Sequence, residues 1–192
     1  MWNKGTILFA TTFTALLLLA IAIAPHNLLA QVKTTITNFI SYQNSTYGIK
    51  IQYPSHWQKQ ENGTKQDTQT DIVTFYAPAS NTNANLDLSI DDISDETGIS
   101  LAQYANNSLT DLKQSLTNFK LIESSGNNHI SGLPAYRIVY TSNNGNNVTK
   151  TLETGTINGN KVYILTYETG ISEYTTFLPN VQKMIDSFQI TK

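Results

Sequence analysis

Three strand-like segments near the C-terminus, joined by asparagine–glycine turns, restrict the fold more than any other feature of the sequence. The segments are Ala135–Thr141, Val148–Thr156 and Lys161–Thr169. The sequence NNGNN at 143–147 joins the first two, and Asn158–Gly159 joins the last two. Asparagine and glycine accept the positive φ angles of tight hairpin turns. We therefore expect three consecutive strands in an antiparallel meander.

The alternation of side chains in this meander predicts a sheet that is covered on both faces. Every second side chain of a strand points to the same face. One face of each of the first and third strands is apolar, with Tyr136, Ile138, Tyr140, Tyr163, Leu165 and Tyr167. The opposite faces also carry apolar residues, namely Val139, Val162 and Ile164. A sheet with apolar groups on both sides needs a covering layer on each of them.

Shorter strands are expected ahead of the meander. Residues 48–53 alternate strictly before Pro54, Trp57 opens a second short run, and Asn62–Gly63 predicts a turn. Ile72–Tyr76 is the third expected strand. The inward face of the fourth consists of Leu86, Leu88 and Ile90. The outward face of that strand consists of Asp87, Ser89 and Asp91. Lys120–Ser125 is expected to form one more strand.

Two amphipathic helices complete the expected elements. Ser100 and Gln103 have the spacing of a capping box, in which each side chain bonds the other residue's backbone N–H. The buried stripe that follows contains Leu101, Ala105, Leu109, Leu112, Leu116 and Phe119. Ser172 is expected to cap the second helix, and Pro179 is expected to restart it at a first-turn position. The result is an α+β domain with a central, mainly antiparallel sheet and two main helices.

The N-terminal segment is expected to direct export. No Lys, Arg, Asp or Glu lies between Lys4 and Lys33, and residues 15–24 read ALLLLAIAIA. A short positive region followed by an apolar run is typical of a signal peptide, and 18 residues from Ile7 approach the length of a membrane span. We interpret residues 1–30 as a signal peptide or retained membrane anchor, with a buried core helix as the alternative.

This interpretation divides the chain into three parts. Residues 31–41 form a polar tether, and residues 42–192 form one domain. The domain is expected outside the cytoplasm, either secreted or held at the cell membrane by the N-terminal segment.

Composition excludes several classes of function. The 192 residues carry 12 Lys and Arg against 14 Asp and Glu, so the formal net charge is −2. This balance argues against a nucleic-acid partner, which would require a strongly positive surface. The chain contains no cysteine, which excludes disulfides, thiolate metal sites and a cysteine nucleophile.

Landmarks along residues 42–190 resemble those of the PsbP family. Tyr47-Gly48-Ile49 precedes a YPxxW turn, here Tyr53-Pro54-Ser55-His56-Trp57. The later landmarks follow in the family's order: FYAP at 75–78, the helix from Leu101, GLPAY at 132–136, KVY at 161–163 and MIDSF at 184–188.

The resemblance implies an α-β-α sandwich around an antiparallel sheet. Photosynthetic members of the family are extrinsic subunits that help to retain calcium and chloride at photosystem II, and a nuclear Ran-binding protein and exported bacterial lipoproteins share the fold. This sequence resembles the non-photosynthetic, exported branch, with an archaeal PsbP-related protein as one alternative. A fold with such different partners does not define a function by itself.

A short acidic run and one histidine are the candidate metal ligands. The run contains Asp91, Asp92, Asp95 and Glu96, and His56 lies in the turn beside Trp57. Carboxylate oxygens suit Ca²⁺ or Mn²⁺, and histidine suits Zn²⁺. The alternative is a solvated loop whose acidic residues favour the N-terminus of the next helix, together with an exposed loop histidine.

Four N-x-[ST] sequons are candidate glycosylation sites: Asn44, Asn62, Asn106 and Asn147.

These observations favour a non-enzymatic binding or accessory module, because no P-loop, HExxH sequence or complete nucleophile elbow is present. Its partner is expected to be an envelope protein or a small ligand. A divalent-metal-binding protein is the alternative, and a hydrolase with an unrecognised serine or aspartate is a third hypothesis. No cofactor is required by any sequence pattern, and the oligomeric state stays open.

Overall fold

A computed structural model of the chain describes residues 38–78, 83–96, 98–145 and 147–191. The expected signal or anchor segment and most of the expected tether lie outside these residues. The chain divides into two units, Met1–Thr35 and Ile36–Lys192, and only the second is described below. No helix of the described residues is long and apolar enough to cross a membrane.

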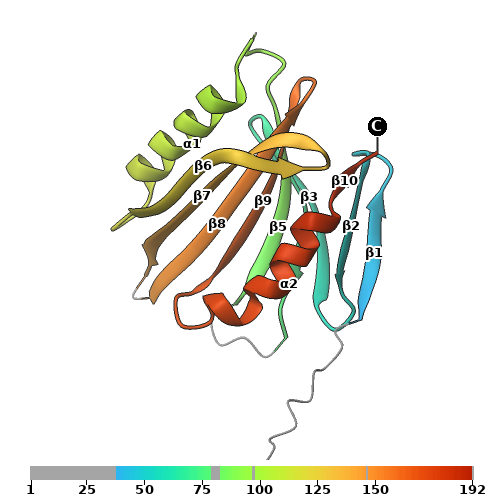
Figure 1. Cartoon of the computed structure of the whole chain (residues 1–192), viewed down its shortest axis with the longest axis vertical. Helices are drawn as coiled ribbons and strands as arrows, with labels where there is room; N and C mark the ends of the chain where they lie inside the picture. Colours follow the sequence, from blue (N-terminus) through green and yellow to red (C-terminus); the bar gives the residue numbers. More distant parts are fainter. Residues whose placement is uncertain (1–37, 79–82, 97, 146, 192) are drawn as a thin grey trace, which may run out of the picture. The chain divides into compact units, whose positions relative to one another are not determined.

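The second unit contains ten strands and two helices among its described residues (Figure 1). They are β1 (Phe39–Asn44), β2 (Ile49–Pro54), β3 (Gln58–Gln66), β4 (Gln69–Tyr76), β5 (Asn85–Asp92), α1 (Leu101–Ser115), β6 (Lys120–Ile130), β7 (Leu133–Asn144), β8 (Asn147–Asn158), β9 (Lys161–Gly170), α2 (Tyr174–Ser187) and β10 (Gln189–Ile190).

Seven of the strands form one antiparallel sheet in the order β3-β4-β5-β9-β8-β7-β6. The expected meander is confirmed: β7 pairs with β8, and β8 pairs with β9. The remaining strands form a small antiparallel sheet in the order β1-β2-β10. The pairing that joins the two halves of the large sheet is between β5 and β9, which are far apart in the sequence.

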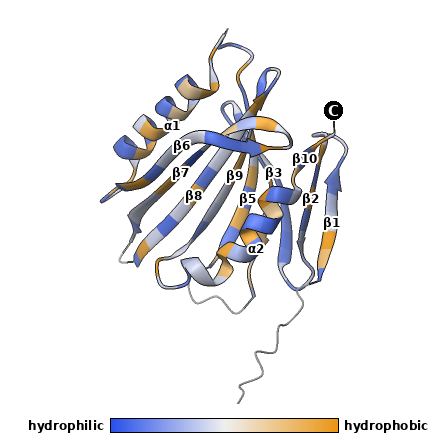
Figure 2. Cartoon of the chain, in the orientation of Figure 1, coloured by the Kyte–Doolittle hydropathy of each residue, from blue (hydrophilic) through white to orange (hydrophobic). Residues whose placement is uncertain are grey.

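Two apolar clusters lie on opposite faces of the large sheet, so the expected covering on both sides is also confirmed. One cluster contains Leu88 and Leu165 of the sheet with Val181 and Met184 of α2, and the small sheet joins it through Ile51. The other cluster contains Ile138 and Val162 and is covered by α1. The hydropathy colouring shows apolar and polar residues alternating along the strands (Figure 2).

Three expected boundaries differ in the structure. The first strand begins at Phe39, so the expected tether to residue 41 overlaps β1. Asn62–Gly63 is not the hairpin turn: Gly63, with a φ of +66°, lies at a β-bulge inside β3. The chain reverses instead after Gln66, where Asp67 has a φ of +50°. Asparagine and glycine serve bulges as well as turns because both need positive φ.

The second helix begins differently from the prediction. Ser172 does not cap it; Glu173 occupies the N-cap position and makes no side-chain cap bond. Pro179 does not restart the helix but lies inside α2. Packing of Val181, Met184 and Ile185 against the core offsets the backbone hydrogen bond that an interior proline removes.

Candidate functional site

Helix α1 lies over the large sheet without being buried in it. Its expected capping box is confirmed: the Gln103 N–H donates to Ser100 Oγ at 3.2 Å, and the Ser100 N–H donates to Gln103 Oε1 at 2.9 Å. The helix ends at Ser115, earlier than the apolar stripe predicts, although Leu116 and Phe119 still pack against the same cluster. No residue of α1 is fully buried. This loose cover leaves space between the helix and the strands.

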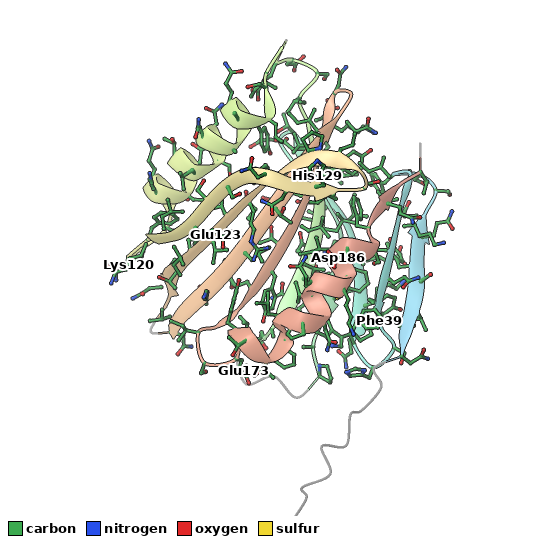
Figure 3. The ribbon with its side chains drawn as sticks, viewed as in Figure 1. Phe39, Lys120, Glu123, His129, Glu173 and Asp186 are labelled. Atoms are coloured by element: carbon green, nitrogen blue, oxygen red, sulfur yellow. The ribbon has the colours of Figure 1, made fainter. Side chains whose placement is uncertain are left out.

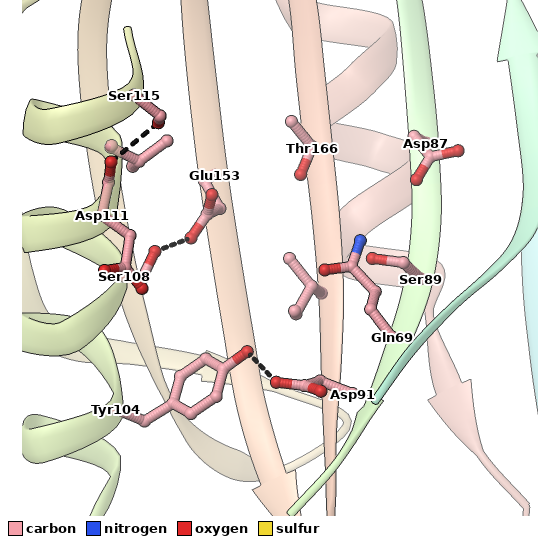
Figure 4. Close-up of a pocket in the computed structure, with 12 residues that line it drawn as sticks. Gln69, Asp87, Ser89, Asp91, Tyr104, Ser108, Asp111, Ser115, Glu153 and Thr166 are labelled. Carbon is pink, nitrogen blue, oxygen red and sulfur yellow. Dashed lines mark hydrogen bonds between the residues drawn. The ribbon is translucent and has the colours of Figure 1, made fainter. Parts of the chain in front are cut away.

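That space is a polar cleft of about 450 Å³ between α1 and the strands β4, β5, β8 and β9 (Figure 4). It is lined by Gln69, Asp87, Ser89, Asp91, Tyr104, Ser108, Asp111, Leu112, Ser115, Glu153, Ile164 and Thr166. Four of these residues are acidic, and none of these lining residues is Lys, Arg or His. The cleft is therefore rich in hydrogen-bond acceptors and negative in charge.

Glu153 is the most enclosed acidic group of the cleft. Only 9% of its surface is exposed. The hydroxyls of Ser108 and Tyr136 both donate to its Oε1, each at 2.8 Å. Burial raises the pKa of Glu153, while the two hydrogen bonds lower it. Burial and the nearby Glu153 charge raise the pKa of Tyr136 well above its ordinary value, so this phenol remains a donor.

A glycine makes the Tyr136–Glu153 contact possible. Tyr136 of β7 lies opposite Gly155 of β8 in the sheet register. A Cβ atom at Gly155 would lie 2.7 Å from Cε1 of the Tyr136 ring. The missing side chain lets the ring lie over the strand, as expected where glycine permits a close approach.

Asp91 links β5 to the helix. The Tyr104 hydroxyl donates to its Oδ2 at 2.8 Å, as the dashed line in Figure 4 shows. Its other oxygen, Oδ1, is buried and has no hydrogen-bond partner among the described residues. A buried acceptor without a donor is unfavourable, so a cation or a hydrogen-bond donor beside this oxygen would stabilise it.

Asp87 lies at the end of a hydrogen-bonded chain. The Asn62 amide donates to Thr74 Oγ1 at 2.8 Å, and the Thr74 hydroxyl donates to Asp87 Oδ1 at 2.8 Å. Burial raises the pKa of Asp87 to about 6; the Thr74 bond opposes this rise and the Asp71 charge adds to it.

The structure separates the residues of the expected metal site. Successive strand residues point to opposite faces, so Asp91 lines the cleft and the exposed Asp92 does not. Hydrogen bonding with the side chain of Ser94, and with the Ser94 N–H that donates to Asp92 Oδ1 at 3.0 Å, lowers the pKa of Asp92. Asp95 and Glu96 are exposed in the loop that leads to α1.

The two histidines of the domain do not join the acidic run. His56 is exposed between β2 and β3, and His129 is exposed on β6 (Figure 3). Within the part of the chain that the structure describes, no three His, Asp or Glu side chains are grouped to hold a metal ion.

The four sequons differ in their surroundings. Asn106 on α1 and Asn147 at the start of β8 are exposed. Asn44 is half-buried; its Nδ2 donates to the Tyr42 hydroxyl and its Oδ1 accepts from the backbone N–H groups of Thr46 and Tyr47. The amide of Asn62 is engaged with Thr74.

Sequence reasoning missed most of the cleft. It expected Asp87, Ser89 and Asp91 to face outward, but Ser89 is buried and all three line the cleft beneath α1. The prediction was wrong because polar residues on a strand indicate solvent only where no other element covers that face. Glu153 in the middle of an otherwise apolar and threonine-rich strand was the available signal.

An antiparallel sheet covered by one helix on each face defines an α+β sandwich, and the family comparison agrees with this class. The family of PsbP-like proteins matches residues 24–190, so the chain belongs to the PsbP-like family. This confirms the resemblance seen in the sequence. A search of curated proteins finds no match.

Solved structures share the fold at low sequence identity. The solution structure of the cyanobacterial PsbP of Synechocystis, CyanoP, is 20% identical, with a TM-score of 0.60 over 82% of this chain and 95% of that one. LpqN of Mycobacterium tuberculosis, described as involved in cell envelope biogenesis, is 14% identical, with a TM-score of 0.58 over 88% and 100%. The Ran-binding protein Mog1p of Saccharomyces cerevisiae is 9% identical, with a TM-score of 0.51 over 81% and 97%.

Proposed function

We propose that this chain is a non-enzymatic binding module that works outside the cytoplasm and takes a ligand, or a group of a partner molecule, into the α1 cleft. The observation that carries the proposal is the cleft itself: about 450 Å³ of space, lined by four carboxylic acids and by no basic residue among those described. Such a volume is typical of small-molecule sites.

The chemistry of the cleft favours binding over catalysis. A hydrolase needs a nucleophile beside a general base. The Ser108 hydroxyl donates a hydrogen bond to Glu153 Oε1, but the same oxygen also accepts from the Tyr136 hydroxyl, so it is shared between two donors. Ser100 is committed to the helix cap. These interactions are those of a scaffold that holds its acidic groups in place.

The proposed location rests on the N-terminal sequence, in which no charge lies between Lys4 and Lys33. The fold neighbour LpqN, involved in cell envelope biogenesis, supports an extracytoplasmic role. The neighbour Mog1p is a Ran-binding protein, which supports an accessory role through binding.

Site-specific photo-cross-linking in intact cells tests this proposal. Gln69 lines the cleft and Gln182 lies on α2; both are exposed, and each donates its amide to a nearby aspartate. Benzoylphenylalanine at residue 69 of the full chain is expected to yield a defined adduct that is absent with the same group at residue 182. An epitope tag at the C-terminus is expected to be digested by external protease. Identical adducts from both positions, or a protected tag, would contradict the proposal.

Divalent-metal binding is the second candidate, and Asp91 favours it because its Oδ1 is buried without a donor. Calorimetric titration of the full chain with Ca²⁺, Mn²⁺ and Zn²⁺ tests this function. Stoichiometric binding that Asp91→Asn abolishes would support it, and heats equal to those of dilution would end it.

A further inference from the structure

We propose that the ligand of the α1 cleft is a linear aliphatic polyamine, held through its ammonium groups by the carboxylates beneath α1. This inference rests on the proposed binding function and names the chemical class that the cleft accepts.

The acidic groups are spread along the cleft and do not meet at one point. In the sheet register Thr166 of β9 lies between Glu153 of β8 and Asp87 of β5. Two strand spacings therefore place the backbones of Glu153 and Asp87 about 10 Å apart. Asp91 lies four residues from Asp87 on the same face of β5, a separation of about 13 Å along the strand. A ligand with several positive charges on an extended chain matches this distribution.

The enclosed carboxylic acids have few donors among the described residues, and none of the donors that reach them is charged. Glu153 is more than nine-tenths buried, lines the cleft, and accepts the Ser108 and Tyr136 hydroxyls on Oε1, so its carboxyl group is held at the cleft wall. Asp91 Oδ1 has no partner among the described residues. An ammonium group offers three donors and no acceptor, so it suits a cleft of this kind.

The remaining lining favours an organic cation over a metal ion. Calcium and similar ions require several oxygens within about 2.6 Å of one point. No such group of three acidic or histidine side chains occurs among the described residues. Leu112 and Ile164 also line the cleft and offer apolar contact to methylene groups. Methylene segments between charges are what distinguish a polyamine from a bare cation.

Calorimetry of the full chain in a nonionic detergent, with spermidine as the probe, tests the inference. Saturable binding with one molecule per chain is expected. Glu153→Gln and Asp87→Asn are each expected to raise the Kd by about tenfold or more, because each removes a charged hydrogen-bond acceptor. The matched control is Asp186→Asn, which removes an exposed carboxylate of α2 (Figure 3) and is expected to change the Kd by less than about twofold.

Acidification provides a second readout. Burial raises the pKa of both Asp87 and Glu153, so spermidine is expected to bind more weakly at pH 5 than at pH 7.5. The other titratable groups that face these two from the packed elements are Asp71, Asp91, Tyr104, Asp111 and Tyr136. The two phenols stay neutral because burial raises the pKa of each.

Three results would overturn the inference. They are the absence of spermidine binding, equal losses in Asp186→Asn and the cleft variants, and tighter binding of Ca²⁺ than of spermidine at the same site. Circular dichroism establishes that each variant is folded, and Asp87→Asn serves as the test if Glu153→Gln fails to fold. If spermidine does not bind but the residue-69 adduct persists, the polyamine inference fails and the binding function stands; loss of both removes the two together.

Discussion

At the scale of single residues, the cleft contains acidic side chains in unfavourable surroundings, because burial or a missing hydrogen-bond donor disfavours their charged form. Glu153 is buried, Asp87 is partly buried, and burial raises the pKa of both; Asp91 has an oxygen without a donor among the described residues. Such groups lower the stability of a fold, and they occur mainly at functional sites, where function requires them. Two substitutions measure their effect.

Gly155→Ala is expected to destabilise the domain. The new Cβ would lie 2.7 Å from Cε1 of the Tyr136 ring, which is 2% exposed, so the ring must shift. Overpacking of this kind costs about 1–3 kcal/mol, and displacement of the ring also breaks the Tyr136–Glu153 hydrogen bond. Urea unfolding of the full chain gives the free energy of unfolding. Gly126→Ala is the control, because a Cβ there has no neighbour within 4 Å; equal effects of the two substitutions would refute the argument.

Asp87→Asn is expected to stabilise the domain at neutral pH. The folded-state pKa of about 6 lies above the ordinary aspartate pKa of 3.8, so folding disfavours the charged form. The free energy of unfolding therefore falls as the pH rises from about 4 to about 6, and it stays low above that range. The asparagine carries no such penalty and still accepts from Thr74.

The expected gain from Asp87→Asn is about 1–3 kcal/mol at pH 7.5, with almost none at pH 3.5. Urea unfolding at the two pH values measures it. A gain that is the same at both values would show that charge burial is not its cause.

At the scale of elements, α1 is held by a partly buried apolar stripe, by its cap and by two polar contacts. Tyr104 bonds Asp91, and Ser108 bonds Glu153, while no α1 residue is fully buried. Burial of large apolar side chains is the usual source of helix stability in a protein, so α1 has less of it than α2. The N-cap and the polar contacts of α1 are therefore expected to contribute more to its stability than such features do in α2.

Ser100→Ala is expected to lower the free energy of unfolding by about 1 kcal/mol, because it leaves the Gln103 N–H without its cap acceptor. Amide hydrogen exchange of α1 is expected to rise while that of α2 stays constant. Thr110→Ala is the control: its hydroxyl donates to the Asn106 carbonyl in the exposed part of the same helix, and such a bond adds little to helix stability. Unchanged exchange in α1 would contradict the cap argument.

At the scale of the whole domain, the cleft arises from the order of the strands. The pairing of β5 with β9 brings Asp87 and Glu153 into one cross-strand row of the sheet, with Thr166 of β9 between them, although 66 residues separate them in the chain. Helix α1 then covers this face, while α2 and the small sheet cover the other. Figure 1 shows the two helices on different sides of the large sheet.

Local chemistry explains which elements could be predicted. The capping box at Ser100 and the hairpin at Asn158–Gly159 depend on residues close in sequence, and both predictions are confirmed. The prediction of a turn at Asn62–Gly63 was wrong because these residues also suit a β-bulge. Pro179 was misplaced because packing of the residues after it outweighs the lost backbone bond.

The sequence by itself determined the helices, most strands, the antiparallel meander and membership of the PsbP-like family, because periodicity, caps and turns act over a few residues. Only the tertiary structure decided that Asp87 and Asp91 lie under α1 beside Glu153. The reason is physical: the pattern of one strand shows which side chains share a face, but which element covers that face depends on pairings between distant segments.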